Sequence, residues 1–455
     1  MRYSSAAALF LAAASLHGAH AAGEAPAGTG PTPASGSSPL TRAPCSRYDL
    51  FKPRTEAVLI QTPSCDRIEP ELFGLRAALA EHGMGFSLDV RPQFTYDLGG
   101  HRDVAPTRLY NGQAPTYVLG LESKFTYDLT RVGFGGAAQL VVGVTSQSSN
   151  TKELNPRFNS FNTFAVHQRF FGGQLELQYG YYDLIREYYG MVLGGNASSA
   201  ALGPVSVIPV ELGLSLFTPS PAMGITVKDA SLRWYDRFTV ARSASSTHFP
   251  SSGFQWDIDH NPSGLELTVP DARLLVVNEF GYKTPFGAAG MATWARVGLI
   301  YNASNVERYD QDVGAHAKNN YGAYVAFTKQ LTQPAGFGPK GLYLDLKADY
   351  APSNRNLFAR DYQVAAFYLG PFDSRPMDMV SIGYSSTQFS GHLRKGLSAL
   401  GVPVEKSTSA LTVSYAAKLG PGIAWINGLT YQKGPAFTPR LPDATLLQSM
   451  FNFSF

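Results

Sequence analysis

The sequence predicts an all-β protein, a transmembrane antiparallel β-barrel of about 16 strands with a short N-terminal helix. Three observations predict this fold. The first residues have the pattern of an export signal. From residue 85 onward, apolar and polar residues alternate with the period of a β-strand in segment after segment. The last strand has one apolar and one polar face and stops on Phe455.

Residues 1–21 are expected to be a secretory signal peptide. Arg2 lies in a short polar start, the apolar run Ala6–Leu16 follows, and small residues precede a cleavage point before Ala22. No stretch has the roughly 20 consecutive apolar residues that a transmembrane helix needs. An exported protein with a membrane role would therefore use strands, because only helices and closed barrels satisfy every backbone polar group in lipid.

The composition agrees with a barrel. Charged residues make up only 16% of the chain, against 12% aromatic residues, and there are 45 glycines. Aromatic girdles at the membrane interfaces and many turns would use these residues. The net charge of +3 over 455 residues gives no support to a nucleic-acid partner.

Residues 22–69 are expected to form a flexible lead, since the part up to Pro44 is rich in Gly, Pro, Ser, Thr and Ala and can bury little apolar surface. The two cysteines, Cys45 and Cys65, lie in this lead. An exported chain meets a compartment that permits disulfides, so we expect them to pair. The bond would constrain the lead by roughly 3 kcal/mol in the chain-entropy model. Two unrelated thiols are the alternative.

Residues 70–84 are expected to form a short periplasmic helix. Pro70 suits its first turn, Gly83 is placed to end it, and its leucines share one face. Such a helix would close the periplasmic mouth or lie against the inner wall, and the sequence does not choose between the two.

Residues 85–455 are expected to be the outer-membrane barrel. The clearest strand is 341–350, in which Leu342, Leu344 and Leu346 alternate with polar residues. Soluble sheets also alternate, so the argument depends on repetition without complementary helices. At roughly 23 residues for a strand and its turn, this region holds about 16 strands, wide enough for an aqueous channel. The other expected strands are 86–96, 119–129, 164–171, 174–181, 273–283, 293–302, 321–329, 362–368, 379–384, 411–416, 423–431 and 447–455.

Residues 183–224 interrupt the alternation. This stretch contains a Gly- and Ser-rich run and an apolar run around Val207, and it is too long and too apolar for a solvated hairpin loop. We hypothesise that it folds inward and narrows the channel. The alternative is a surface loop packed on its neighbours.

Five short stretches, in order along the chain, resemble the carbohydrate-selective porins of the OprB family. They are Gly74–Gly83, Leu274–Tyr282, Gly322–Tyr324, Ala351–Asn356 and Arg375–Asp378. The chain departs from the family at Leu72-Phe73, where a tryptophan is expected, and residues 231–265 fit poorly. The resemblance implies a 16-stranded barrel in the bacterial outer membrane that lets monosaccharides, glucose above all, diffuse passively.

A channel selective for sugars needs polar groups opposed across a narrow point, because a sugar is uncharged and dense in hydroxyls. By alternation, the side chains expected to line the pore are Arg91, Arg169, Asp89, Gln93, Glu122, Lys124, Glu176, Glu279, Asp345, Lys347 and Asp349. Their mixed signs would leave little net field. Arg91 and Arg169 are the first candidates for sugar contact, since a planar fork of donors matches adjacent hydroxyls. The plainer interpretation is that most of these residues only solvate a wide lumen.

Two alternatives stay open. One is a general or organic-acid porin, and the other is a barrel-embedded hydrolase, although His167 has no accompanying nucleophile motif. No catalytic residue, metal or cofactor is predicted. The expected partners are monosaccharides, outer-membrane lipid and, as the resemblance implies, the barrel-assembly machinery, which would read Phe455. Both a homotrimer and a monomer stay open.

Overall fold

The computed structural model describes residues 44–54, 58–60, 62–104, 108–152, 154–189, 191–193, 208–245, 253–284, 290–312, 314–334 and 338–455. Within these residues sixteen antiparallel strands form a closed barrel, as the sequence predicts. No helix in this part of the chain is long and apolar enough to cross a membrane. The expected signal peptide and residues 22–43 lie outside the described ranges.

The barrel strands follow one another around the ring. They are β2 (Met84–Asp97), β3 (Thr116–Asp128), β4 (Ala137–Ser149), β5 (Phe158–Phe170), β6 (Leu175–Tyr182), β8 (Ser220–Lys228), β9 (Trp234–Arg242), β10 (Leu274–Thr284), β11 (Thr293–Asn302), β14 (Asn320–Gln330), β15 (Gly341–Tyr350), β16 (Phe358–Leu369), β17 (Met379–Phe389), β18 (Ser407–Gly420), β19 (Ile423–Lys433) and β20 (Ala444–Ser454). The ring closes where β20 pairs with β2, with Phe453 opposite Val90.

The smaller elements lie in the connections. They are η1 (Pro44–Phe51), β1 (Val58–Ile60), η2 (Leu72–Gly74), α1 (Leu75–Glu81), η3 (Leu129–Val132), η4 (Phe171–Gly173), α2 (Leu184–Tyr188), β7 (Met191–Leu193), α3 (Ile208–Glu211), α4 (Gly253–His260), β12 (Val306–Glu307), β13 (His316–Ala317) and α5 (Gly391–Ala399).

The two faces of the barrel strands differ in the predicted way. In β11 the outward residues Val297 and Leu299 are 49% and 58% exposed, whereas Arg296 and Ile300 on the inward row are buried. An apolar outer face suits lipid and a polar inner face suits an aqueous lumen.

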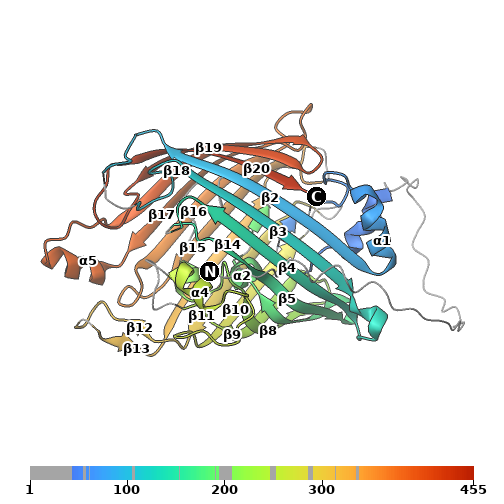
Figure 1. The fold of residues 1–455 in the computed structure, drawn as a ribbon, viewed down its shortest axis with the longest axis horizontal. Coiled ribbons are helices and arrows are strands. Elements are labelled where there is room, and N and C mark those ends of the chain that lie inside the picture. Colours follow the sequence, from blue (N-terminus) through green and yellow to red (C-terminus); the bar gives the residue numbers. More distant parts are fainter. Residues whose placement is uncertain are drawn as a thin grey trace, which may run out of the picture. The chain divides into compact units, whose positions relative to one another are not determined.

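The two ends of the barrel differ in the length of their connections. At one end the turns are short, such as residues 421–422, and at the other lie long loops such as 98–115, 243–273 and 390–406. Outer-membrane barrels have short periplasmic turns and long extracellular loops. Figure 1 shows α1 and the last residue at the short-turn end and α5 at the opposite end.

The structure describes residues 44–54, 58–60 and 62–69 of the lead, where we expected flexibility, and they have defined contacts. Cys45 and Cys65 form a disulfide. The main chain of residues 51–52 bonds to inward side chains of the wall, because Thr126 Oγ1 donates to the Phe51 carbonyl at 2.6 Å and Gln139 Nε2 donates to the Lys52 carbonyl at 3.0 Å. These polar contacts, which composition does not reveal, fix this part of the lead against the inner wall of the barrel.

Helix α1 is shorter than the expected 70–84. Leu72, Phe73 and Gly74 all have positive φ angles, which breaks the chain into a 3₁₀ turn before the helix begins at Leu75. Gly83 is left-handed just after the helix and donates to the Ala80 carbonyl, in the way expected of a helix terminator.

Candidate functional site

The described parts of the stretch between β6 and β8 are residues 183–189, 191–193 and 208–219. Residues 183–189 and 208–219 lie inside the barrel, as hypothesised, and are called the constriction segment. Residues 220–224, which we expected to belong to the inward fold, are instead paired with β6 as the start of β8. The boundary was wrong because Pro221 and Gly224 obscure the strand pattern.

Polar contacts with the wall hold the constriction segment on two sides. Arg186 Nη1 donates to Glu122 Oε1 on β3 at 2.6 Å. Tyr189 Oη donates to Asp349 Oδ2 on β15 at 2.8 Å. Since β3 and β15 are far apart in the strand order, these contacts place the segment across the lumen.

The carbonyl groups that end α2 receive hydrogen bonds from three further strands. A helix leaves its last carbonyls without partners of its own. Here the wall supplies the donors, which are Arg237 to the Glu187 carbonyl at 2.6 Å, Tyr324 to the Tyr188 carbonyl at 3.0 Å and Arg296 to the Tyr189 carbonyl at 2.9 Å. The end of α2 is therefore capped by β9, β14 and β11.

Apolar packing adds to these contacts. Leucines of the constriction segment are buried against inward apolar residues of β10 and β11, in one cluster that includes Leu184, Leu212, Leu214, Leu275, Val277 and Ile300. Each such side chain contributes about 1.5–3 kcal/mol when it is fully buried. The segment is thus a fixed part of the lumen.

Glu122 is the centre of an ion-pair network. Its carboxylate lies 3.2 Å from Arg91, 3.2 Å from Lys124 and 2.6 Å from Arg186, and Asn162 Nδ2 donates to it at 2.8 Å. The Glu122 side chain is buried, so its charge depends on these partners. The structure brings three predicted pore residues together here and adds Arg186, which sequence reasoning missed.

Glu176 is the centre of a second network. Arg169 lies 2.8 Å from its carboxylate and Lys228 2.9 Å, while His167 Nε2 is 3.9 Å away. Arg169 and Arg91, the first candidates for sugar contact, have side chains 43% and 41% exposed. Each therefore has one edge bound to a carboxylate and another facing the lumen.

Glu279 is fully buried and holds two tyrosines. Tyr235 and Tyr324 donate to its carboxylate oxygens at 2.8 Å and 2.5 Å. Trp294 Nε1 in turn donates to Tyr235 Oη at 3.0 Å. Glu279 thus orders the aromatic side chains of the wall and is covered from solute.

The remaining predicted residues also lie on inward rows. Asp345 accepts from Thr328 at 2.6 Å, Asp349 accepts from Tyr189, Lys347 lies 4.9 Å from the Tyr189 ring centroid, Asp89 accepts from Ser454 at 2.5 Å, and Gln93 is half-buried beside Arg91. These side chains therefore lie on the rows that the alternation indicates, and the partners of most of them are wall residues, so their part in binding a solute stays a prediction.

The opposite part of the wall, β17–β20, has small uncharged polar side chains on its inward rows. We call it the hydroxyl wall; its hydroxyl side chains include Ser381, Ser385, Thr387, Thr412, Ser414 and Thr430, and Gln448 adds an amide. Sequence reasoning missed these residues because it selected charged groups. The lumen is asymmetric, with hydroxyl groups on one side and ion pairs with the constriction segment on the other.

A cavity of about 390 Å³ lies between the ordered lead and strands β5, β6 and β8–β11. We call it the lumen cavity. Glu187 of the constriction segment borders it, and Tyr235 and Trp294 contribute aromatic rings. Pockets for small ligands begin at about 300 Å³, so the lumen cavity has room for a monosaccharide.

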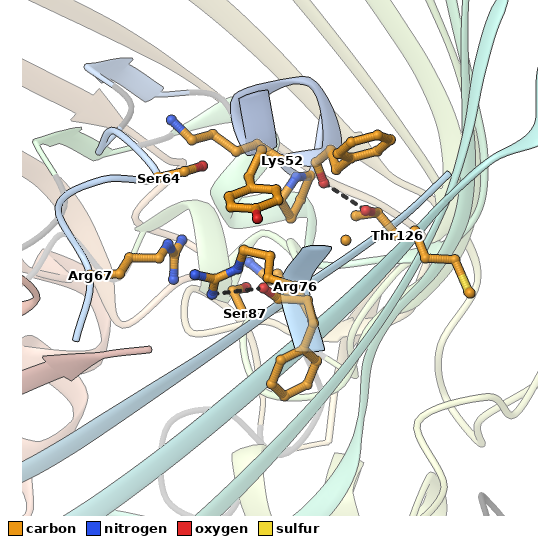
Figure 2. A pocket seen from close by; sticks show the side chains of 13 residues that line it. Lys52, Ser64, Arg67, Arg76, Ser87 and Thr126 are labelled. Carbon is orange, nitrogen blue, oxygen red and sulfur yellow. Dashed lines mark hydrogen bonds between the residues drawn. The ribbon is translucent and has the colours of Figure 1, made fainter. Parts of the chain in front are cut away.

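A second cavity lies under η1 and holds only about 20 Å³. Figure 2 shows the guanidinium groups of Arg67 and Arg76 pointing toward one another beside it, with Thr126 bonded to the lead. Burial, and then the charge of Arg67, hold the pKa of Arg76 below its usual range. The space admits about one water molecule, so this is a packing contact and not a solute site.

Glu211 fastens the other end of the constriction segment. Its Oε1 accepts from the Leu357 N–H at 2.5 Å and its Oε2 from the Phe358 N–H at 3.1 Å. Burial raises the pKa of Glu211 to about 8, although both hydrogen bonds act in the opposite direction. The Glu211 carboxyl group, which can gain or lose a proton, therefore joins α3 to the start of β16.

Comparison with known proteins matches the chain to a protein family, to a curated relative and to solved structures. Residues 118–455 match the family described as carbohydrate-selective porin, OprB family. QuiX of Acinetobacter baylyi, whose name assigns it as a porin, is 22% identical over 217 residues, which is 44% of this chain and 46% of QuiX. The chain thus aligns with less than half the length of this curated relative.

Two solved structures share the fold. The high-pH structure of Pseudomonas putida OprB superposes with a TM-score of 0.68 at 15% identity, covering 85% of this chain and 97% of that one. The low-pH structure of the same protein gives a TM-score of 0.53 at 14% identity, covering 86% and 98%.

Proposed function

The chain belongs to the OprB family of carbohydrate-selective porins, and on that premise we propose that it is a passive channel through which small carbohydrates, glucose among them, diffuse. The family and the closed sixteen-stranded barrel are those of a protein of the bacterial outer membrane. Lipid surrounds the outward apolar rows. The proposal needs no cofactor and no energy input.

The observation that carries the proposal is the inward constriction segment beside a polar wall. A wide barrel alone passes solutes by size. Here Arg186 and Tyr189 fix α2 across the lumen, Glu211 fixes α3, and the inward rows of the hydroxyl wall supply hydroxyl groups to the same lumen. A sugar passing this point exchanges its water hydrogen bonds for hydrogen bonds to the wall, which lowers the cost of its partial desolvation.

We assign direct sugar contact to Arg91 and Arg169. Both are partly exposed, and both are held by buried carboxylates, so their free donors are oriented before a sugar arrives. Asp89 and Gln93 lie beside Arg91 on β2 and complete the polar row. The buried residues Glu122, Glu176, Glu279, Asp345, Lys347 and Asp349 position these groups and the constriction segment, and Lys124 supports Glu122.

A planar bilayer experiment tests the proposal. Glucose added to a single open channel should reduce the ion current in a saturable manner, because a bound sugar occupies the constriction. The double substitution Arg91→Ala with Arg169→Ala should weaken this block while ion conductance persists. If glucose leaves the current unchanged, the channel has no sugar site. If glucose blocks the current of the double variant as strongly as that of the wild type, Arg91 and Arg169 do not bind the sugar.

We also propose that the barrel catalyses no reaction. His167 is the residue on which the hydrolase alternative depended, and it lies on β5 with its Nε2 at 3.9 Å from Glu176. Lipid-ester and peptide-bond hydrolysis by the purified barrel, with His167→Ala as the comparison, tests this directly. Hydrolysis that disappears in the variant would overturn the proposal.

A further inference from the structure

The lumen cavity has an uneven charge. Its lining includes six basic side chains, Lys52, Arg54, Arg169, Lys228, Arg237 and Lys283. It includes three carboxylates, Asp49, Glu176 and Glu187. Even when half-buried Lys283 is left aside, basic groups exceed acidic ones. This differs from the balance of signs that the sequence predicts for the lumen as a whole.

Every carboxylate of this cavity already has a cationic partner. Glu187 lies 3.4 Å from Arg237, and Asp49 lies 2.6 Å from Lys52. Glu176 has two cations, at 2.8 Å and 2.9 Å. The acidic groups are therefore neutralised by some of the basic ones, and the surplus charge of the wall is positive.

Arg54 contributes to this surplus from the lead. Its backbone N–H donates to Gln139 Oε1 at 3.1 Å and its Nη1 donates to the Ala137 carbonyl at 2.9 Å. Both partners are uncharged, so they orient the guanidinium group without cancelling its charge. The lead thus adds a fixed positive group to the cavity that Lys228 and Arg237 also line.

The same cavity offers hydrogen bonds to hydroxyl groups. Gln178, Thr226 and Tyr235 line it, and Trp294 adds an apolar ring. His167 is 3% exposed, and its Nδ1 has no hydrogen-bond partner among the described residues. A buried polar atom without a partner costs free energy, which a ligand hydroxyl in the cavity would recover.

We propose that the lumen cavity selects carbohydrates that carry a carboxylate, such as uronic and aldonic acids, over neutral sugars of the same size. The inference rests on the proposed carbohydrate channel and deepens it. Basic side chains that line a narrow cavity in a low-dielectric protein wall create a positive electrostatic potential there. This potential raises the local concentration of anions. The polar side chains then bind the hydroxyl groups that a sugar acid shares with a neutral sugar.

Uptake into proteoliposomes compares the two substrates. The solutes are radiolabelled glucuronate and glucose, with potassium and valinomycin on both sides to hold the membrane potential near zero. We expect glucuronate to enter faster than glucose by about threefold or more at low salt, and the ratio to fall at high salt because ions screen the wall charge. Chloride should also be more permeant than potassium in a salt gradient.

The matched variants are Lys228→Gln and Lys329→Gln. Lys228 lines the cavity, and its loss leaves Glu176 paired with Arg169. Lys329 lies on the outward row of β14, so its loss removes the same charge from the other face. Only Lys228→Gln should reduce the glucuronate-to-glucose ratio, by about threefold, and Lys228→Arg should restore it.

The outcomes separate this proposal from the one on which it rests. If both solutes enter at equal rates, the charge selectivity is wrong and the carbohydrate channel stands. If neither enters faster than into protein-free liposomes, the carbohydrate channel itself fails. Equal effects of Lys228→Gln and Lys329→Gln would show that the lumen cavity is not where selection occurs.

Discussion

Arg186 of α2 and Glu122 of β3 meet at 2.6 Å, and this ion pair joins the constriction segment to the wall at β3. Other polar contacts of the segment go to β6, β9, β11, β14, β15 and the start of β16. Loss of the Arg186 contact would therefore free one side of the segment while the other side stays in place.

The substitution Arg186→Ala should increase single-channel conductance. A hydrogen bond between charged groups contributes about 1.5–3 kcal/mol, and Glu122 keeps Arg91 and Lys124 as partners, so the barrel itself should remain folded. The measurement is conductance in a planar bilayer. Arg360→Ala, on the outward row of β16, is the control and should leave conductance unchanged. An unaltered conductance in Arg186→Ala would mean that the ion pair does not hold the segment.

Rising pH should loosen the attachment of α3. The folded-state pKa of Glu211 is about 8, above its ordinary value of 4.5, so the folded state retains a proton that the unfolded state releases between these two pH values. Stability from this group is fully present below pH 4.5 and is lost as the pH rises through about 8. Conductance noise from the constriction segment should increase over that window.

Glu211→Gln tests this assignment, because glutamine keeps the acceptor oxygen and does not titrate. The variant should show pH-independent conductance noise between pH 5 and 9, while the wild type becomes noisier. Asp310→Asn, in an exposed part of the β12–β13 loop, is a matched removal of one carboxylate. If Glu211→Gln retains the wild-type pH profile, another group is responsible.

Reduction of the Cys45–Cys65 disulfide should loosen the lead. The bond constrains the chain by about 3 kcal/mol in the loop-closure model, and the lead forms one side of the lumen cavity. Limited proteolysis should then cut within residues 44–69, and conductance should rise. The variant with both cysteines changed to serine should show the same pattern with or without reductant. A lead that stays protected after reduction would show that its wall contacts suffice.

Deletion of Phe455 should impair barrel assembly more than conduction. Phe455 exchanges two backbone hydrogen bonds with Leu88, at 2.8 Å and 3.2 Å, and its carbonyl accepts from Arg67, so it closes the seam between the first and last strands. The yield of heat-modifiable folded barrel in outer membranes measures assembly. Phe455→Tyr keeps the ring and should assemble normally. If the barrel assembles fully without Phe455, this residue is not part of a signal for insertion.

The strand pattern could be predicted where the two faces differ sharply. The expected strands 293–302 and 341–350 have the same bounds as β11 and β15. Three barrel strands, β4, β8 and β9, were missed. In β4 the consecutive apolar residues Leu140, Val141 and Val142 hide the period of two, and β8 contains Pro221 and Gly224.

The candidate site could be predicted only in part, for a physical reason. Alternation identifies which side of a strand a residue faces, so all eleven expected pore residues lie on inward rows. Alternation does not identify the residues of helices and loops that contact those side chains in the folded protein. Arg186 lies in α2, a short helix in the connection between β6 and β8 where the alternation stops, and Arg54 lies in a lead whose position depends on tertiary hydrogen bonds. The positive surplus of the lumen cavity arises from such residues.

The central claim is that the constriction recognises carbohydrates and does not filter by size alone. The direct test is the rate of solute entry into proteoliposomes, measured for neutral and acidic monosaccharides and for polyethylene glycols of the same hydrodynamic radii. The account predicts that the sugars enter faster than polyethylene glycols of equal radius, and that Arg91→Ala with Arg169→Ala reduces this advantage. If the entry rates of sugars and polyethylene glycols depend on hydrodynamic radius in the same way, the result would contradict this claim.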